Sequence, residues 1–228
     1  MTDPSTRYVL TPLAEATDVD RAELATLLTA TFQDDAVWTA FQPTPTETRH
    51  ALVHLILSER LALIAPYTFA IRSRATNAVV GSVALTPPHA GTNTAPNAEA
   101  QAKLDAFVSI IGEDTILRLT TLMSSVGAIA ATVVDGAAWT LESVCVAPEL
   151  RGKGVGTWAV QEVLEKEAPK GAVVLLNTQE ESNVRWYAGR CGFRLVDERV
   201  VQLEEDEGRA FTNWVMVREI ADVVAKAP

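Results

Sequence analysis

The sequence has little cysteine and little histidine. In 228 residues there are two cysteines, Cys145 and Cys191, and three histidines, His50, His54 and His89. The cysteines form no CxxC pair, and no carboxylate stands at metal-ligand spacing from a histidine. The sequence therefore predicts neither a disulfide framework nor a metal site. We expect a cytoplasmic protein with reduced thiols.

Basic residues are also in the minority, with 19 lysines and arginines against 29 aspartates and glutamates. A general nucleic-acid binder needs a basic face, so nucleic acid is not an expected partner. No apolar run approaches the roughly 18 residues that span a bilayer, and the first residues do not resemble a secretory leader, so no membrane association is predicted. The acidic balance suits a cationic small molecule or peptide, or serves solubility alone.

Aromatic residues make up only 6% of the chain, but 48% of it is hydrophobic, which is enough for an aliphatic core. One compact domain over residues 1–228 is expected. Its first part predicts a strand at 7–13, a helix from Asp18 or Asp20 to Phe32, and a helix at 47–63. A β-hairpin follows, with strands at 68–72 and 79–85.

The segment from about 89 to 137 has the character of an insertion. Residues 89–99 are rich in Gly, Thr, Asn, Ala and Pro, which predicts an exposed loop. Two helical patterns follow, separated by Gly112: one contains Leu104, Phe107, Val108 and Ile111, the other Ile116, Leu119, Met123 and Val126. The helices either cover the core or form a lid over an acceptor pocket.

The second half predicts a strand–helix–strand unit. A strand at 139–147 leads through a glycine-rich loop into a helix that ends near Pro169 and Gly171. Residues 172–177 form a continuous apolar run, typical of a strand buried on both faces, so the two strands should be parallel. A short helix to Arg190, a strand that begins with residues 192–196 and a strand at 211–218 complete an α/β chain with a mixed central sheet.

The loop after residue 150, R-G-K-G-V-G-T, suits an anion, because glycines there precede a helix N-terminus whose N–H groups lack helical acceptors. A dinucleotide fingerprint would need a third glycine at Thr157 and an acidic residue about 20 positions later, and both are missing. A P-loop would need Ser or Thr after Lys153, where Gly154 stands. Neither phosphate loop fits.

The loop does contain R-x-x-G-x-G, with Arg151, Gly154 and Gly156, after V-x-P at Val146 and Pro148. With its flanking strand and helix, it resembles the acetyl-CoA pyrophosphate loop of the GNAT superfamily of N-acetyltransferases. Further matches to that superfamily are Asn183, Tyr187, the Gly192-Phe193 pair and the order of elements. The resemblance covers most of the chain and implies the GNAT fold, a mixed sheet with a parallel cofactor-binding unit flanked by helices. The insertion and Trp214-Val215-Met216 look most like puromycin N-acetyltransferase and its relatives.

The resemblance implies acetyl-CoA as cofactor. The central strand would hold the thioester and pantetheine arm through backbone groups, in a splayed gap beside the next parallel strand. Asn183 would lie beside that arm. The implied cofactor-binding residues are Val144, Cys145, Val146, Arg151, Gly152, Lys153, Gly154, Val155, Gly156, Thr157, Asn177, Asn183 and Tyr187.

The resemblance also implies catalytic roles. Tyr187 would protonate the leaving thiolate, and Glu142 on the central strand would accept a proton from the amine. One departure concerns Tyr187: Gly192 stands five positions after it, where the family usually has the glycine four positions after, and a bulge eased by Gly189 would absorb the extra residue. Cys145 as a covalent nucleophile is an alternative that its apolar strand disfavours.

Acceptor binding is expected from the loop between the first two helices, with Asp34, Asp35 and Trp38 as candidate residues. The predicted function is transfer of acetyl to the amine of a small molecule by direct attack. Two alternatives stay open: a GNAT-fold module that binds an acyl-CoA without transfer, and an O-acetyltransferase. The sequence contains no indication of the oligomeric state.

Overall fold

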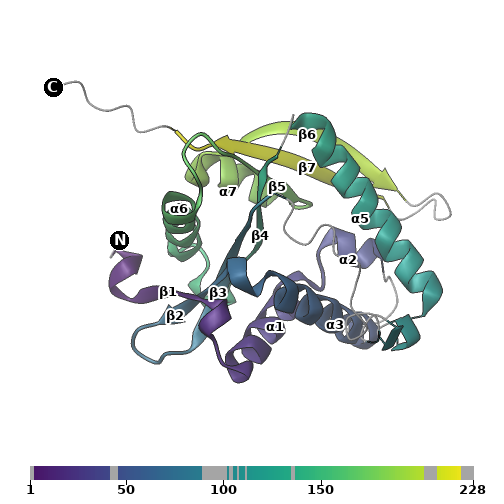
Figure 1. The fold of residues 1–228 in the computed structure, drawn as a ribbon, viewed down its shortest axis with the longest axis horizontal. Coiled ribbons are helices and arrows are strands. Elements are labelled where there is room, and N and C mark those ends of the chain that lie inside the picture. The colour runs from purple at the N-terminus through teal and green to yellow at the C-terminus, as the bar shows by residue number, and fades with distance from the viewer. Residues whose placement is uncertain are drawn as a thin grey trace.

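The computed structural model describes residues 3–41, 46–88, 102, 105–106, 108–110, 112–134, 137–202 and 210–221. A seven-stranded sheet runs through the molecule in the order β1-β2-β3-β4-β5-β7-β6 (Figure 1). Its strands are β1 (Tyr8–Pro12), β2 (Thr68–Ser73), β3 (Val79–Thr86), β4 (Trp139–Val146), β5 (Val173–Thr178), β6 (Arg194–Gln202) and β7 (Ala210–Glu219). Of the described strand pairs, β4 and β5 are parallel and the others antiparallel. The predicted mixed α/β fold is confirmed.

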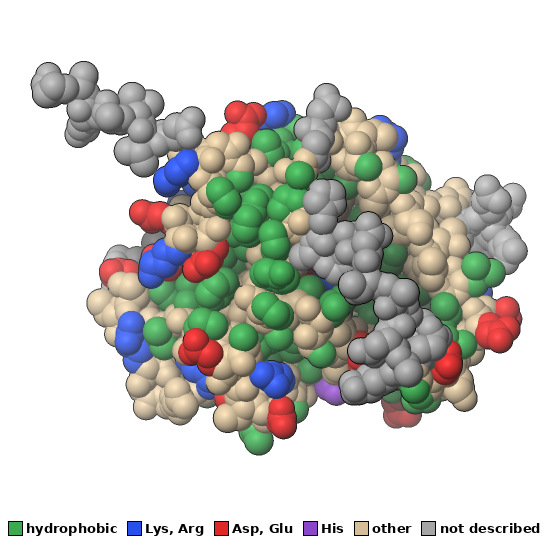
Figure 2. Space-filling view, viewed as in Figure 1, with side chains coloured by type: hydrophobic (Ala, Val, Ile, Leu, Met, Phe, Trp, Pro, Cys, Tyr) green, Lys and Arg blue, Asp and Glu red, His purple; other side chains and the backbone are tan. Residues whose placement is uncertain are grey.

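Helices cover both faces of this sheet (Figure 1). They are α1 (Asp18–Phe32), α2 (Ala36–Phe41), α3 (Thr46–Ile64), α5 (Glu113–Val133), α6 (Val155–Glu167) and α7 (Glu181–Cys191). One core cluster joins α6 and α7 to the sheet, and two others join it to α1, α2, α3 and α5. Seen from the side drawn in Figure 2, hydrophobic side chains gather in the middle and charged ones lie mostly toward the periphery.

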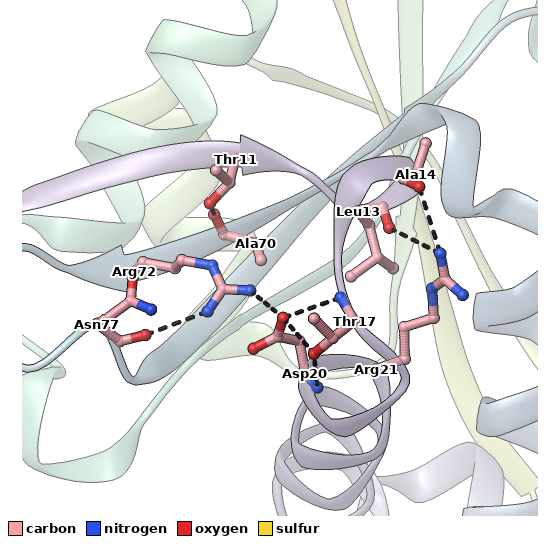
Figure 3. Close-up of polar contacts among 9 residues, drawn as sticks. All are labelled: Thr11, Leu13, Ala14, Thr17, Asp20, Arg21, Ala70, Arg72 and Asn77. Atoms are coloured by element: carbon pink, nitrogen blue, oxygen red, sulfur yellow. Dashed lines mark hydrogen bonds and ion pairs between the residues drawn. The ribbon is translucent and has the colours of Figure 1, made fainter.

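The start of α1 is tied to strand β2 by a polar network (Figure 3). Thr17 and Asp20 form a capping box, which satisfies free N–H groups at the helix start. Arg72, only 7% exposed, forms a 2.8 Å ion pair with Asp20 and donates to the carbonyl of Asn77. The Arg72 guanidinium and then the Thr17 hydroxyl lower the pKa of Asp20, so its carboxylate is charged at neutral pH. This network helps to fix α1, whose far end borders the site described below.

Most predicted elements have the expected type, with two differences. The short helix α2 was not predicted, because the polar residues before it interrupt the pattern of α1. Strand β6 begins two residues later than predicted and continues to Gln202. Gly112, with φ +84°, precedes α5, as the break between the insertion helices requires. Residues 89–101, the proline turn at 43–45, the turn at 204–208 and residues 224–228 lie outside the described residues.

Helix α5 has the length and composition to cross a membrane, although no membrane association was predicted from the sequence. Polar Thr and Ser residues interrupt its apolar positions, so no continuous apolar run extends over its whole length. One stripe, with Leu122 and Ile129, packs against α2 and strands β6 and β7, while Leu117 and Met123 are exposed. Length and composition alone do not separate a membrane span from a helix that covers a core.

Candidate active site

The centre of the sheet contains a gap between β4 and β5. Register pairs between them are found only at Trp139–Val174 and Thr140–Leu175. Beyond Thr140 the strands separate, so the end of β4 pairs only with β3 among the described strands. Within β4, Ser143 has φ +52° and the register to β3 shifts, which marks a β-bulge. The predicted splayed gap is therefore present.

The bulge is held from β3 by a buried hydroxyl. Ser82 Oγ donates to the carbonyl oxygen of Ser143 at 2.6 Å and lies 3.4 Å from Cys145 Sγ. Burial raises the pKa of the Cys145 thiol to about 11, although the Ser82 hydrogen bonds act in the opposite direction. Since the thiolate is the nucleophilic form, a covalent role for Cys145 is disfavoured.

A cavity of about 970 Å³ opens at this gap. The end of β4, the glycine loop and the first turn of α6 form one side, and residues from α1 and α7 form the other. It has the size of a small-molecule or cofactor site. The predicted site residues that line it are Asp35, Val144, Cys145, Val146, Arg151, Gly152, Lys153, Gly154, Val155, Gly156, Thr157 and Asn183.

One end of the cavity is built to hold an anion. Gly154, in the left-handed region with φ +80°, turns the chain into α6. The first helical bond runs from Trp158 N–H to the Gly154 carbonyl, so the N–H groups of residues 155–157 have no acceptor within the helix. The positive end of the helix dipole and the nearby Arg151 and Lys153 favour phosphate there.

Tyr187 does not line this cavity. It is 8% exposed and packs in the core, with ring contacts to Trp186 and Phe193. Burial raises the pKa of its phenol above the ordinary value. The extra residue before Gly192 lengthens α7 to Cys191, instead of forming the expected bulge at Gly189. The general-acid role predicted for Tyr187 does not fit this placement.

The structure places Trp186 in the cavity instead. Its indole Nε1 donates to Thr157 Oγ1 at 3.0 Å, which joins α7 to the first turn of α6. Neighbouring residues on a helix point about 100° apart, so a one-residue change in phase decides which aromatic ring faces the site. The tryptophan directly before Tyr187 was the available signal in the sequence.

Glu142 lies outside the cavity lining and is held by other side chains. Arg60 of α3 donates to it through Nε at 3.1 Å and through Nη2 at 2.8 Å, and the Thr86 hydroxyl also donates to it. A carboxylate that accepts from these three donors fastens α3 to β4 and is oriented toward them. The base role predicted for Glu142 therefore does not fit its surroundings.

Three further predicted residues also lie away from the cavity lining. Asp34 is 68% exposed and forms a 2.7 Å ion pair with Arg49. Trp38 is buried in the core beside α5 and β7. Asn177 accepts a 3.1 Å hydrogen bond from Asn213 of β7. Their substrate- and cofactor-binding roles therefore do not follow from this geometry.

Several cavity residues were not predicted from the sequence. Thr31 and Phe32 come from the end of α1, Glu180 precedes α7, and Gln161 lies on α6. No local motif marks these positions, because the fold alone brings their elements together. Glu180 and Asp35 add two carboxylates to the lining, which also contains the basic residues of the glycine loop.

We expect Tyr187→Phe to change turnover by less than about threefold. The hydroxyl is buried away from the cavity, so its removal should leave the reacting groups in place. Steady-state kinetics of the purified variant beside the wild type would measure the change. A loss of turnover of about tenfold or more, in a variant with unchanged thermal stability, would return the acid role to Tyr187.

Comparison with known proteins bears directly on this site. Residues 122–193, which include β4, the glycine loop, α6, β5 and α7, match the family model described as acetyltransferase (GNAT) family. The match covers about a third of the chain, and these residues resemble a GNAT acetyltransferase domain. No curated protein matches the sequence significantly.

Solved structures resemble the GNAT fold of the chain over almost its whole length. An acetyltransferase from Corynebacterium glutamicum described as histone acetyltransferase HPA2 and related acetyltransferase has a TM-score of 0.60 and 14% identity, covering 96% of this chain and 99% of its own. Drosophila melanogaster polyamine N-acetyltransferase has a TM-score of 0.58 and 15% identity, and the match covers 93% of this chain and 99% of that enzyme. Sinorhizobium meliloti phosphinothricin acetyltransferase, solved with AcCoA, has a TM-score of 0.54 and 14% identity, and the match covers 97% of this chain and 93% of that enzyme. At these identities the likeness shows the fold.

Proposed function

We propose that this protein is a cytoplasmic N-acetyltransferase that moves acetyl from acetyl-CoA to the amine of a small molecule. The observation that carries the proposal is a single cavity that is lined both by a phosphate-binding loop and by two carboxylates. The glycine loop and α6 N-terminus suit a phosphate group, and Asp35 and Glu180 line the same cavity beside the open edge of β4.

The residues present fit a coenzyme A thioester. The N–H groups at the start of α6, with Arg151 and Lys153, would hold its pyrophosphate. The unpaired edge of β4 at Val144 to Val146 would hold the pantetheine arm by backbone hydrogen bonds. Space beside Gly154, where an added Cβ would meet no atom within 4 Å, leaves room for a ligand at the loop.

When bound, acetyl-CoA supplies a thioester whose acyl carbon forms the new C–N bond as its C–S bond breaks, with that electron pair leaving on sulfur. The acceptor enters as an ammonium ion, since an alkylamine has a pKa of about 10.4. Its nitrogen gives up two protons overall, of which one ends on the thiol and one reaches solvent. The residues of this chain must therefore bind a cation and remove a proton from it.

The acidic side of the cavity favours an amine as acceptor. Among the fold relatives, the Drosophila melanogaster enzyme is described as a polyamine N-acetyltransferase. The resemblance to puromycin N-acetyltransferase adds aminonucleosides to the candidate acceptors. A cation of either kind would be attracted by Asp35 and Glu180.

Release of free thiol from acetyl-CoA, measured over a panel of acceptors, tests this function. The panel contains polyamines, aminonucleosides, amino acids, peptides with free N-termini, and matched alcohols. Turnover with an amine and none with its matched alcohol is the expected result. Acetyl-CoA binding in calorimetry without turnover on the panel would favour a binding module, and turnover with alcohols would favour O-acetylation.

A further inference from the structure

The acceptor side of the cavity presents a carboxylate that other protein groups leave available. Asp35 follows α1 and lines the cavity together with Val144 and Cys145 of β4. Within the described part of the chain, its carboxylate makes no hydrogen bond or ion pair. Asp34 beside it is paired with Arg49 instead, and Glu142 is held by Arg60. Of the carboxylates predicted for the acceptor chemistry, Asp35 is therefore the one that faces the cavity.

A second carboxylate stands at the mouth of the same cavity. Glu180 is exposed, comes directly before α7, and makes no side-chain capping bond to that helix. Asp35 and Glu180 both line the cavity, and the negative charge of Glu180 raises the pKa of Asp35. Like charges on two carboxylates that line one cavity repel each other, so a bound ammonium group would relieve the repulsion.

We propose that Asp35 accepts the proton of the acceptor ammonium group and that Glu180 helps to hold that cation, an assignment that rests on the proposed N-acetyltransferase function. In this step an N–H bond of the ammonium breaks, its electron pair stays on nitrogen, and the proton passes to a carboxylate oxygen of Asp35. The neutral amine then has the lone pair needed for attack. Release of the proton to solvent restores Asp35.

The electrostatics of the cavity suit this role. Burial raises the pKa of Asp35 to about 7; Glu180 and Asp34 add to the rise, and Arg151 opposes it. Asp34 is itself paired with Arg49 of α3, and the Cys145 thiol on β4 is neutral. A proton transfer from an alkylammonium of pKa about 10.4 then crosses a gap of about three pKa units, against about six for an ordinary carboxyl. A general base works best when its pKa is near the working pH.

Asp35→Asn is expected to lower kcat/KM for the best alkylamine acceptor by 100-fold or more at pH 7, with unchanged acetyl-CoA affinity in calorimetry. The defect should shrink to less than about tenfold for a β,β,β-trifluorinated analogue of that amine, which is mostly neutral at pH 7. If Asp35 had a purely structural role, the substitution would lower kcat/KM for both acceptors by the same factor. Asp35→Ala serves as the second variant if the asparagine variant is poorly folded.

The pH profile gives an independent measurement. Because the base must be ionised, wild-type kcat/KM should fall as the pH drops through about 7, the pKa of Asp35. Glu180→Gln removes a like charge that raises this pKa, so the acidic limb should move to lower pH. Glu181→Gln is the matched control: its carboxylate is 71% exposed, pairs with Arg185, and lies outside the cavity lining, so its limb should not move.

A carbon-13 NMR titration of the aspartate carboxyl groups checks the same assignment without turnover. We expect one signal with a midpoint near pH 7 in the wild type, and its loss in Asp35→Asn. Wild-type turnover with an amine, combined with an Asp35→Asn defect below threefold, would overturn the Asp35 assignment alone. Failure of the wild type on every amine would overturn the proposed function and this assignment together. A dominant loss in Glu142→Gln instead would return the base role to Glu142.

Discussion

Gly154→Glu is expected to weaken acetyl-CoA binding by at least 100-fold while the protein stays folded. Gly154 precedes α6 with φ +80°, and an added Cβ would meet no protein atom within 4 Å. The new side chain therefore fits the protein, and its effect falls on the ligand. A carboxylate at this position would occupy the place intended for phosphate and would satisfy the free N–H groups itself.

The expected loss of acetyl-CoA affinity follows from repulsion between the new carboxylate and the pyrophosphate. At a separation of about 6 Å and an effective dielectric constant of about 20, two like charges repel by roughly 3 kcal/mol. Each 1.4 kcal/mol corresponds to tenfold in affinity, so even one such repulsion reaches about 100-fold. The backbone adds a cost of roughly 1–2 kcal/mol in stability, because non-glycine residues rarely adopt this conformation.

Gly154→Gln separates these effects. Glutamine has nearly the shape of glutamate and the same backbone cost, but no charge. Titration calorimetry with acetyl-CoA should show a much smaller loss for glutamine than for glutamate, and thermal unfolding should show similar stabilities for both. Wild-type affinity in Gly154→Glu would mean that the pyrophosphate lies elsewhere, and the cofactor end of the cavity would have to be reassigned.

The elements around the cofactor end could be predicted because local signals agree there. The apolar run before Asn177 indicates a buried strand, the glycines after Arg151 indicate a turn into a helix, and together they require parallel strands. The same local signals placed Arg151 to Thr157 in one turn, and the structure places this turn in the cavity lining. Backbone conformation decides that placement, and short sequence motifs report backbone conformation well.

The direction of side chains could be predicted less well. Tyr187 and Trp186 are neighbours in sequence, and the length of α7 decides which of them faces the cavity. Glu142 was expected to act on the acceptor amine, but its carboxylate is bound by Arg60, which lies 82 positions away in the sequence. Asp34 and Asp35 are adjacent residues of the same type. Only the turn after α1 decides that Asp34 forms an exposed ion pair while Asp35 lines the cavity. Such choices depend on tertiary contacts that no local pattern contains.

Gly81→Ala is expected to be the most destabilising single-methyl change near the site. Gly81 lies on β3 opposite Val146 of β4, and a Cβ there would overlap the carbonyl oxygen of Cys145. It would also approach the Val146 Cα at 3.2 Å and the Ile71 Cδ1 at 3.0 Å. A side chain such as Ile71 can rotate away, but two of the three atoms belong to the backbone of β4, so the strand itself must move.

The expected cost is about 3 kcal/mol, at the upper end for overpacking. For a chain of this size that corresponds to a fall of roughly 6–12 °C in the unfolding midpoint. Turnover should fall as well, by about 100-fold, because a shift of about 1 Å in β4 displaces the edge that would hold the thioester. The losses of stability and of turnover share one cause, the shift of β4. The affinity for acetyl-CoA, measured at a temperature where the variant is folded, should therefore fall as well.

Gly127→Ala is the matched control for this change. Gly127 lies within α5, an added Cβ there meets no atom within 4 Å, and helix propensity favours alanine by about 0.5–1 kcal/mol. Thermal and urea unfolding of both variants should therefore give shifts of opposite sign. If Gly81→Ala unfolds like the wild type and keeps its turnover, β3 and β4 have room between them that this structure does not contain. The close approach that positions Cys145 at the gap would then need another cause.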